Sequence, residues 1–195
     1  MNLSFPLVYL FFSGLVGILA IVFMLQLWRR PLVPRIIKPA YWISVALTVF
    51  YVSYITYLQY RAFGDNPVSL TIGKQGIWWF VGYAQSHFWN PYIISFIASL
   101  LIFWVSAYLN RKRGEIFFET EETYLIALGT FATGYPGFFF YIIFVLFVSV
   151  IGSVALGKKN ERFPLYYVWM PSAIALLCFI LFFATHQDWW ARLLF

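Results

Sequence analysis

Five stretches of this chain are almost uninterruptedly apolar, and each is about as long as a membrane-spanning helix. They cover residues 7–27, 40–60, 91–109, 137–156 and 165–185. A helix needs roughly 20 apolar residues to cross a hydrocarbon core of about 30 Å. Because 63% of the residues are hydrophobic and only 10% are charged, the composition excludes an ordinary water-soluble domain. The sequence predicts an all-α, polytopic membrane helix bundle in which residues 1–195 form a single integral membrane domain.

A sixth stretch, residues 119–134, is shorter, because about 16 helical residues extend only about 24 Å. The basic residues predict whether it crosses, since positive charge marks the cytoplasmic side of short loops. Ten of them form three clusters: Arg29, Arg30, Arg35 and Lys38; Arg111, Lys112 and Arg113; Lys158, Lys159 and Arg162.

These clusters share one side of the membrane only if residues 119–156 leave that side and return to it. Gly134-Tyr135-Pro136-Gly137 is suited to the turn of such a hairpin, because glycine and proline interrupt helices. We therefore expect six transmembrane helices with both termini outside, in a multi-pass protein of the cytoplasmic membrane. Its first partner is the lipid bilayer. The net charge of +6 is accounted for by these loops and does not indicate a nucleic-acid partner.

The long segment at residues 61–90 is expected outside, at the membrane interface. It contains the turn signal Gly64-Asp65-Asn66-Pro67 and then an aromatic stretch at residues 77–89. Tryptophan and tyrosine collect at the headgroup level of membranes. The stretch is consistent with an interfacial helix or re-entrant turn, and equally with a lid over a ligand-binding bundle.

Carboxylates concentrate in one place, since four of the seven acidic residues are Glu115, Glu119, Glu121 and Glu122. Crowded carboxylates at a membrane edge can act as a general acid and base pair, because their pKa values spread apart. Thr120 followed by two glutamates is also typical of a helix N-terminus, where a hydroxyl caps free amides and acidic side chains meet the helix dipole. Both interpretations remain open from the residues alone.

Histidine offers little for a metal site. His87 and His186, the latter close to Asp188, are both expected outside, whereas the glutamates are expected inside. We therefore expect no metal and no cofactor. The serines and threonines of the apolar runs are expected to bond to helix backbone or to a neighbouring helix.

From residue 111 onward, the order of features resembles the C-terminal half of the type IV prepilin leader peptidase family. After the second basic cluster the chain offers Gly114-Glu115, then Tyr124-Leu125-Ile126-Ala127-Leu128-Gly129, the turn at Gly134, Gly152-Ser153, a basic loop and Phe163-Pro164-Leu165. Counted back from Gly129, an aspartate of the family falls on Glu121. The Gly-x-Gly that precedes that aspartate in the family is Phe118-Glu119-Thr120 here.

The N-terminal half is similar at residues 27–35, which keep Arg29 and Val33-Pro34 of the family's Asp-x-Arg-x-x-x-Ile-Pro-Asn pattern. The family's first catalytic aspartate is Leu27 in this chain. In the family, two aspartates together activate the water that cuts the leader peptide. The resemblance therefore implies a prepilin-peptidase-like protein that is inactive, or one that is altered and uses Glu121, Glu119 or Glu122, with a basic leader peptide as partner.

Two other classes of function remain open. One is a small-molecule binding or transport bundle that resembles a substrate-binding subunit of a vitamin importer, with residues 78–89 as its lid. The other is a structural subunit that joins another membrane protein in a larger complex.

Overall fold

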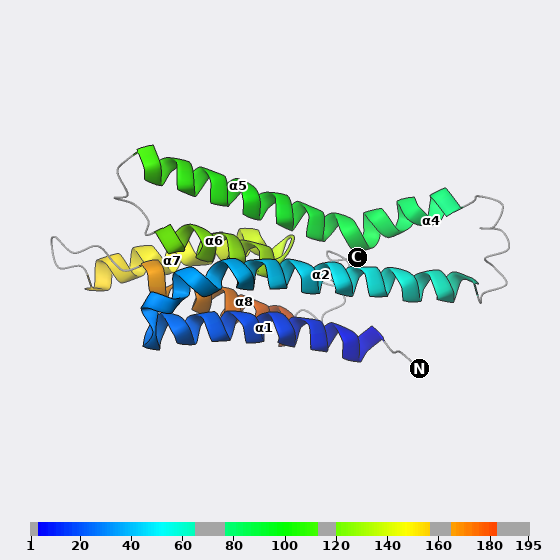
Figure 1. Ribbon diagram of the computed structural model, residues 1–195, viewed down its shortest axis with the longest axis horizontal. Helices are drawn as coiled ribbons and strands as arrows, with labels where there is room; N and C mark the ends of the chain where they lie inside the picture. The colour runs from blue at the N-terminus through cyan, green and yellow to red at the C-terminus, as the bar shows by residue number, and fades with distance from the viewer. Residues whose placement is uncertain (1–3, 65–76, 113–119, 157–164, 183–195) are drawn as a thin grey trace.

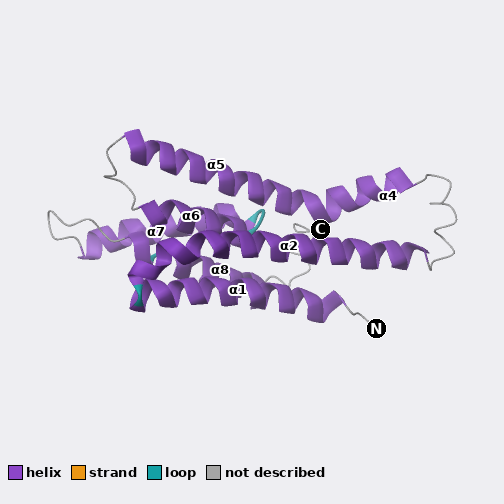
Figure 2. Cartoon of the chain, viewed as in Figure 1, coloured by secondary structure: helices purple, strands orange, loops and turns teal. Residues whose placement is uncertain are grey.

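The computed structural model describes residues 4–64, 77–112, 120–156 and 165–182, which are helical apart from short turns and contain no strand. The elements are α1 (Ser4–Trp28), η1 (Arg30–Leu32), α2 (Val33–Gly64), α4 (Ile77–Ala84), η2 (Gln85–Trp89), α5 (Asn90–Lys112), α6 (Thr120–Thr133), α7 (Gly137–Leu156), η3 (Leu165–Tyr167) and α8 (Trp169–Phe182). The helices run roughly along one common axis (Figures 1 and 2). The expected all-α class is confirmed.

Four helical stretches are long and apolar enough to cross a membrane. They are Leu7–Trp28, Arg30–Phe63, Ile77–Lys112 and Leu165–Phe182. Gly137–Gly152, within α7, is apolar but shorter. The described part of the chain therefore contains four helices that could span a membrane.

The short helix α6 lies at the centre of the bundle. Residues 125–133 of α6 are all buried, and the helix contacts α2, α5, α7 and α8. Small side chains such as Ala127, Gly129 and Ala132 let neighbouring helices approach closely. Its hydroxyls bond within the helix, because Thr130 donates to the Ile126 carbonyl oxygen at 2.8 Å and Thr133 to that of Gly129 at 2.9 Å. The buried hydroxyl groups of Thr130 and Thr133 are thus both paired.

A tight turn joins α6 to α7, as the glycines and proline predict. Gly134 has a φ of 67°, a left-handed conformation that glycine adopts without steric cost. Its carbonyl oxygen accepts a 2.7 Å hydrogen bond from the backbone N–H of Phe138, which starts the next helix. A short helix of 14 residues and a longer helix of 20 residues flank this turn, which lies where the sequence predicts it.

Two helices are much longer than the apolar runs that predict them. α2 covers Val33–Gly64 instead of residues 40–60, and it includes Pro34 and Pro39 close to its beginning. Pro34 lies in the first turn of the helix, where its missing N–H has no partner to lose. Pro39 lies inside the helix, where a proline removes one backbone hydrogen bond. The expected boundary at residue 91 is also displaced, since α4 begins at Ile77 and continues through the π-helical η2 into α5. The π-helical turn η2 lies just before Pro91, which has no backbone N–H to donate to the helix.

The ends of α2 and α4 extend beyond the other helices (Figure 1). At 1.5 Å per residue, α2 is about 48 Å long and the continuous helix of α4, η2 and α5 about 54 Å. Aromatic pairs join the two projecting ends: Tyr60 with Phe80, and Phe63 with Trp79, Phe80 and Tyr83, at 5.3–6.3 Å between ring centroids. These contacts hold α4 against α2 where no other described helix covers them.

Hydroxyl groups in the helices mostly bond to their own backbone, as expected. Ser44, Thr48 and Ser95 each donate to the carbonyl oxygen four residues earlier. Between helices, the hydroxyl groups of Tyr41 on α2 and Ser99 on α5 lie 2.8 Å apart. This hydrogen bond ties the two longest helices together beside α6.

Candidate functional site

The two described glutamates of the acidic stretch lie in the first turn of α6. The side chain of Glu122 is buried, with 5% of its surface exposed, whereas Glu121 is half-buried. Glu115 and Glu119 lie outside the described residues, and so does the side chain of Thr120. The positive end of the α6 dipole favours carboxylates in this first turn. The sequence singles out Glu121, but Glu122 is the carboxylate that the fold holds away from water.

Leu27, the position that a catalytic aspartate occupies in prepilin peptidases, faces outward. Half of its surface (50%) is exposed, while its neighbour Gln26 is buried at 1%. α1 packs mainly on α2 and α8, whereas α6 packs on α5, α2, α8 and α7. A side chain at position 27 therefore points away from the bundle in which Glu122 is buried.

Gln26 is the polar group that α1 directs into the bundle. Its Nε2 donates to the Tyr166 carbonyl oxygen at 3.1 Å, which connects the end of α1 to η3. Within the described part of the chain its Oε1 has no hydrogen-bond partner. The Arg30 guanidinium lies 4.9 Å from the centre of the Tyr166 ring, a distance at which the ring face attracts a cation. No sequence motif distinguishes Gln26 from the other polar residues of the apolar runs.

The ends of α1 and α5 and the beginnings of α2 and α6 lie at the same end of the bundle (Figure 1), and cationic residues occur in or directly beside all but the last of these segments. We call this the basic end, and its described members are Arg29, Arg30, Arg35, Lys38, Arg111 and Lys112, all exposed. The Lys38 ammonium lies 5.3 Å from the centre of the Tyr124 ring of α6. The third predicted cluster, together with Arg113, lies outside the described residues. Two of the three predicted clusters thus meet at one end of the fold.

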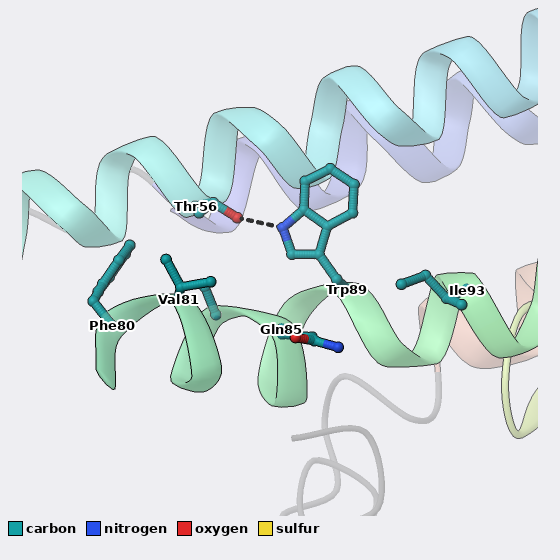
Figure 3. A pocket seen from close by; sticks show the side chains of 7 residues that line it. Thr56, Phe80, Val81, Gln85, Trp89 and Ile93 are labelled. Atoms are coloured by element: carbon teal, nitrogen blue, oxygen red, sulfur yellow. Dashed lines mark hydrogen bonds between the residues drawn. The ribbon is translucent and has the colours of Figure 1, made fainter. Parts of the chain in front are cut away.

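A second candidate site is an open recess between α2 and the helix formed by α4, η2 and α5 (Figure 3). It has a volume of about 390 Å³ and is lined by Thr56, Phe80, Val81, Ala84, Gln85, Trp89 and Ile93. Trp89 points from η2 toward α2, where its Nε1 donates to Thr56 Oγ1 at 3.2 Å. The lining is apolar apart from Thr56 and Gln85. Such a recess suits an apolar or aromatic molecule.

No group of three or more histidine, cysteine, aspartate or glutamate side chains that could hold a metal ion occurs among the described residues. His87 is exposed and stacks on the Tyr83 ring, with 4.3 Å between ring centroids. Its Nδ1 lies 2.9 Å from Ser86 Oγ and 3.0 Å from the Tyr83 carbonyl oxygen. His186 and Asp188 lie outside the described residues. His87 therefore belongs to the aromatic contacts of α4.

The fold defines an all-helical protein whose longest helices can span a membrane. Comparisons with protein-family models, with curated proteins and with solved structures find no match for the chain.

Proposed function

We propose that the chain is a six-span protein of the cytoplasmic membrane with both termini outside. The four long apolar helices and the α6–α7 hairpin support this count. The basic end supports the orientation, because positive residues are retained on the cytoplasmic side. Its cations lie between α1 and α2, in the first two turns of α2 and at the end of α5. Fusions of a reporter that is active only outside the membrane test the topology. Activity is expected at both termini and after residue 70, and none after residue 113.

We further propose that the protein is a non-catalytic relative of the prepilin leader peptidases. The observation that carries this proposal is that Leu27 of α1 faces outward, away from the bundle in which Glu122 of α6 is buried. A carboxylate dyad needs two acidic groups that share and pass one proton, and position 27 offers an aliphatic side chain. A single buried carboxylate cannot complete the same cycle.

The test is co-expression of the protein with a type IV prepilin, followed by detection of the shortened pilin. No cleavage is expected from the wild-type chain. Cleavage that disappears in Glu121→Gln, Glu122→Gln or Glu119→Gln, but persists in Arg61→Gln, would refute the proposal and establish an altered peptidase. The described residues also do not favour binding of a basic leader peptide. Every exposed charge among them at the basic end is cationic and would repel such a peptide.

The recess between α2 and α4 supports a second candidate function, namely the binding of a small apolar or aromatic molecule from the outer side. Thermal unfolding of the purified protein in the presence of such compounds tests it. A stabilising ligand should lose its effect in Trp89→Ala, which removes one wall of the recess, and keep it in Glu122→Gln at the other end. If every active compound stabilises the wild type and Trp89→Ala equally, the recess is not the binding site.

A further inference from the structure

The elbow between α1 and α2 combines cations with exposed apolar side chains in a short, tightly folded segment. α1 ends at Trp28, and the backbone N–H of Leu32 donates to the Arg29 carbonyl oxygen at 2.9 Å. α2 begins directly afterward at Val33. The backbone between the two helices is therefore short and hydrogen-bonded.

Two cations of this elbow are engaged by the fold, and two are not. Arg30 lies on the Tyr166 ring and Lys38 on the Tyr124 ring. Arg29 and Arg35 are exposed, and no described carboxylate pairs with either. Glu121 and Glu122, which are the acidic residues of the described part of the chain, are half-buried and buried. Among the described residues, the positive charges of Arg29 and Arg35 therefore have no paired carboxylate.

Apolar side chains lie directly beside these charges. Trp28 is 78% exposed and Leu27 50% exposed on α1. Trp42 is 59% exposed on α2, one turn beyond Lys38 and on the same face of the helix. A free anion would use only the charges, whereas this surface offers an amphipathic ligand sites for both its anionic and its apolar parts.

We propose that this elbow binds the headgroup of an anionic phospholipid, with Arg29 and Arg35 contacting the phosphate and with Trp28 and Trp42 flanking the upper acyl chains. Basic surfaces between helices at the cytoplasmic face attract anionic headgroups. Indole rings prefer the same depth in the bilayer. The assignment is independent of any peptidase ancestry, because it uses none of the glutamates.

The experiment measures lipid binding to the purified full-length protein by native mass spectrometry, with phosphatidylglycerol and phosphatidylcholine of identical acyl chains. Phosphatidylglycerol should bind more tightly to the wild type. Arg29→Gln with Arg35→Gln should weaken that binding by about 25-fold, since each surface charge contributes about fivefold. Arg29→Lys with Arg35→Lys keeps the charge and should retain most of the binding. Arg61→Gln, an exposed charge at the opposite end of α2, is the matched control and should leave the binding unchanged.

Equal binding of the two lipids, or an equal loss in Arg61→Gln, would overturn the proposal. Inorganic phosphate and sodium chloride are then compared at the same ionic strength. Both should weaken binding equally by screening. Displacement by phosphate alone would instead identify a site for a free anion and would also overturn the lipid assignment.

Discussion

The ring of Tyr141 on α7 lies directly against the backbone of Gly129 on α6, in the space that a side chain at position 129 would occupy. A methyl group added at Gly129 would overlap the Tyr141 hydroxyl and ring. The tyrosine is fully buried, and its hydroxyl donates to the Trp169 carbonyl oxygen at 3.3 Å. Three helices, α6, α7 and α8, are therefore fixed by one glycine and one phenol.

Gly129→Ala should destabilise the protein by about 1–3 kcal/mol, as overpacking in a close-packed core does. Unfolding in a denaturing detergent titration measures the change. The double variant Gly129→Ala with Tyr141→Phe should recover part of the loss, because the hydroxyl oxygen is among the overlapping atoms. Gly17→Ala is the matched control, since nothing lies within 4 Å of the added carbon there. Equal losses in the two alanine variants would contradict the role of Tyr141.

Gln26→Leu should change the free energy of unfolding by no more than about 1 kcal/mol. The variant loses the hydrogen bond to the Tyr166 carbonyl oxygen, worth about 0.5–1.5 kcal/mol, and relieves the cost of burying an unpartnered Oε1. Gln26→Glu should be far more damaging, because it places a carboxylate of nearly the same shape in the same buried position. Thermal unfolding of both variants measures this contrast. Similar stabilities of the two would show that water reaches the side chain.

Phe63→Ala should loosen the projecting pair of helices without unfolding the bundle. It removes three aromatic contacts to α4, each worth about 0.5–1.5 kcal/mol beyond its buried area. Hydrogen exchange of the amides in α4 should then accelerate by at least about tenfold, which corresponds to about 1.4 kcal/mol. Tyr57→Ala is the control on the same helix, because Tyr57 is exposed. Acceleration that spreads to α6 would contradict a local effect.

The hydrogen bond between Tyr41 and Ser99 should contribute a small coupling energy. Interhelical hydrogen bonds in membrane proteins average about 0.6 kcal/mol and reach about 1.7 kcal/mol. A double-mutant cycle with Tyr41→Phe and Ser99→Ala measures it through the free energy of unfolding. A coupling indistinguishable from zero would mean that the contact serves packing alone.

The all-α class and the approximate positions of the long apolar helices could be predicted from the sequence, but the ends of these helices could not. The turn at Gly134 was predictable because a glycine and a proline interrupt the helix there. The extension of α2 back to Val33 was not predictable, because Arg35 and Lys38 interrupt the apolar run without interrupting the helix. The start at Ile77 was also missed, since an aromatic stretch at the interface and a continuing helix have the same composition.

The candidate site was predictable only in part. The acidic stretch and the basic clusters could be found by their charge. The sequence could not show which carboxylate is buried, because Glu121 and Glu122 are adjacent. The rotation of α6 about its axis decides which of the two side chains faces the bundle. The recess lined by Thr56 and Trp89 joins two helices whose contact no local pattern indicates.

The sequence by itself determined that this protein consists of apolar helices for a membrane and where positive charge gathers between them, because hydropathy and charge are properties of composition along the chain. Only the tertiary structure decided that Gln26 points inward and Leu27 outward, and that the short α6 is central. A helix that is apolar all around carries no amphipathic pattern to show which face is buried. That choice depends on close packing against neighbours such as Tyr141, which are distant in the sequence.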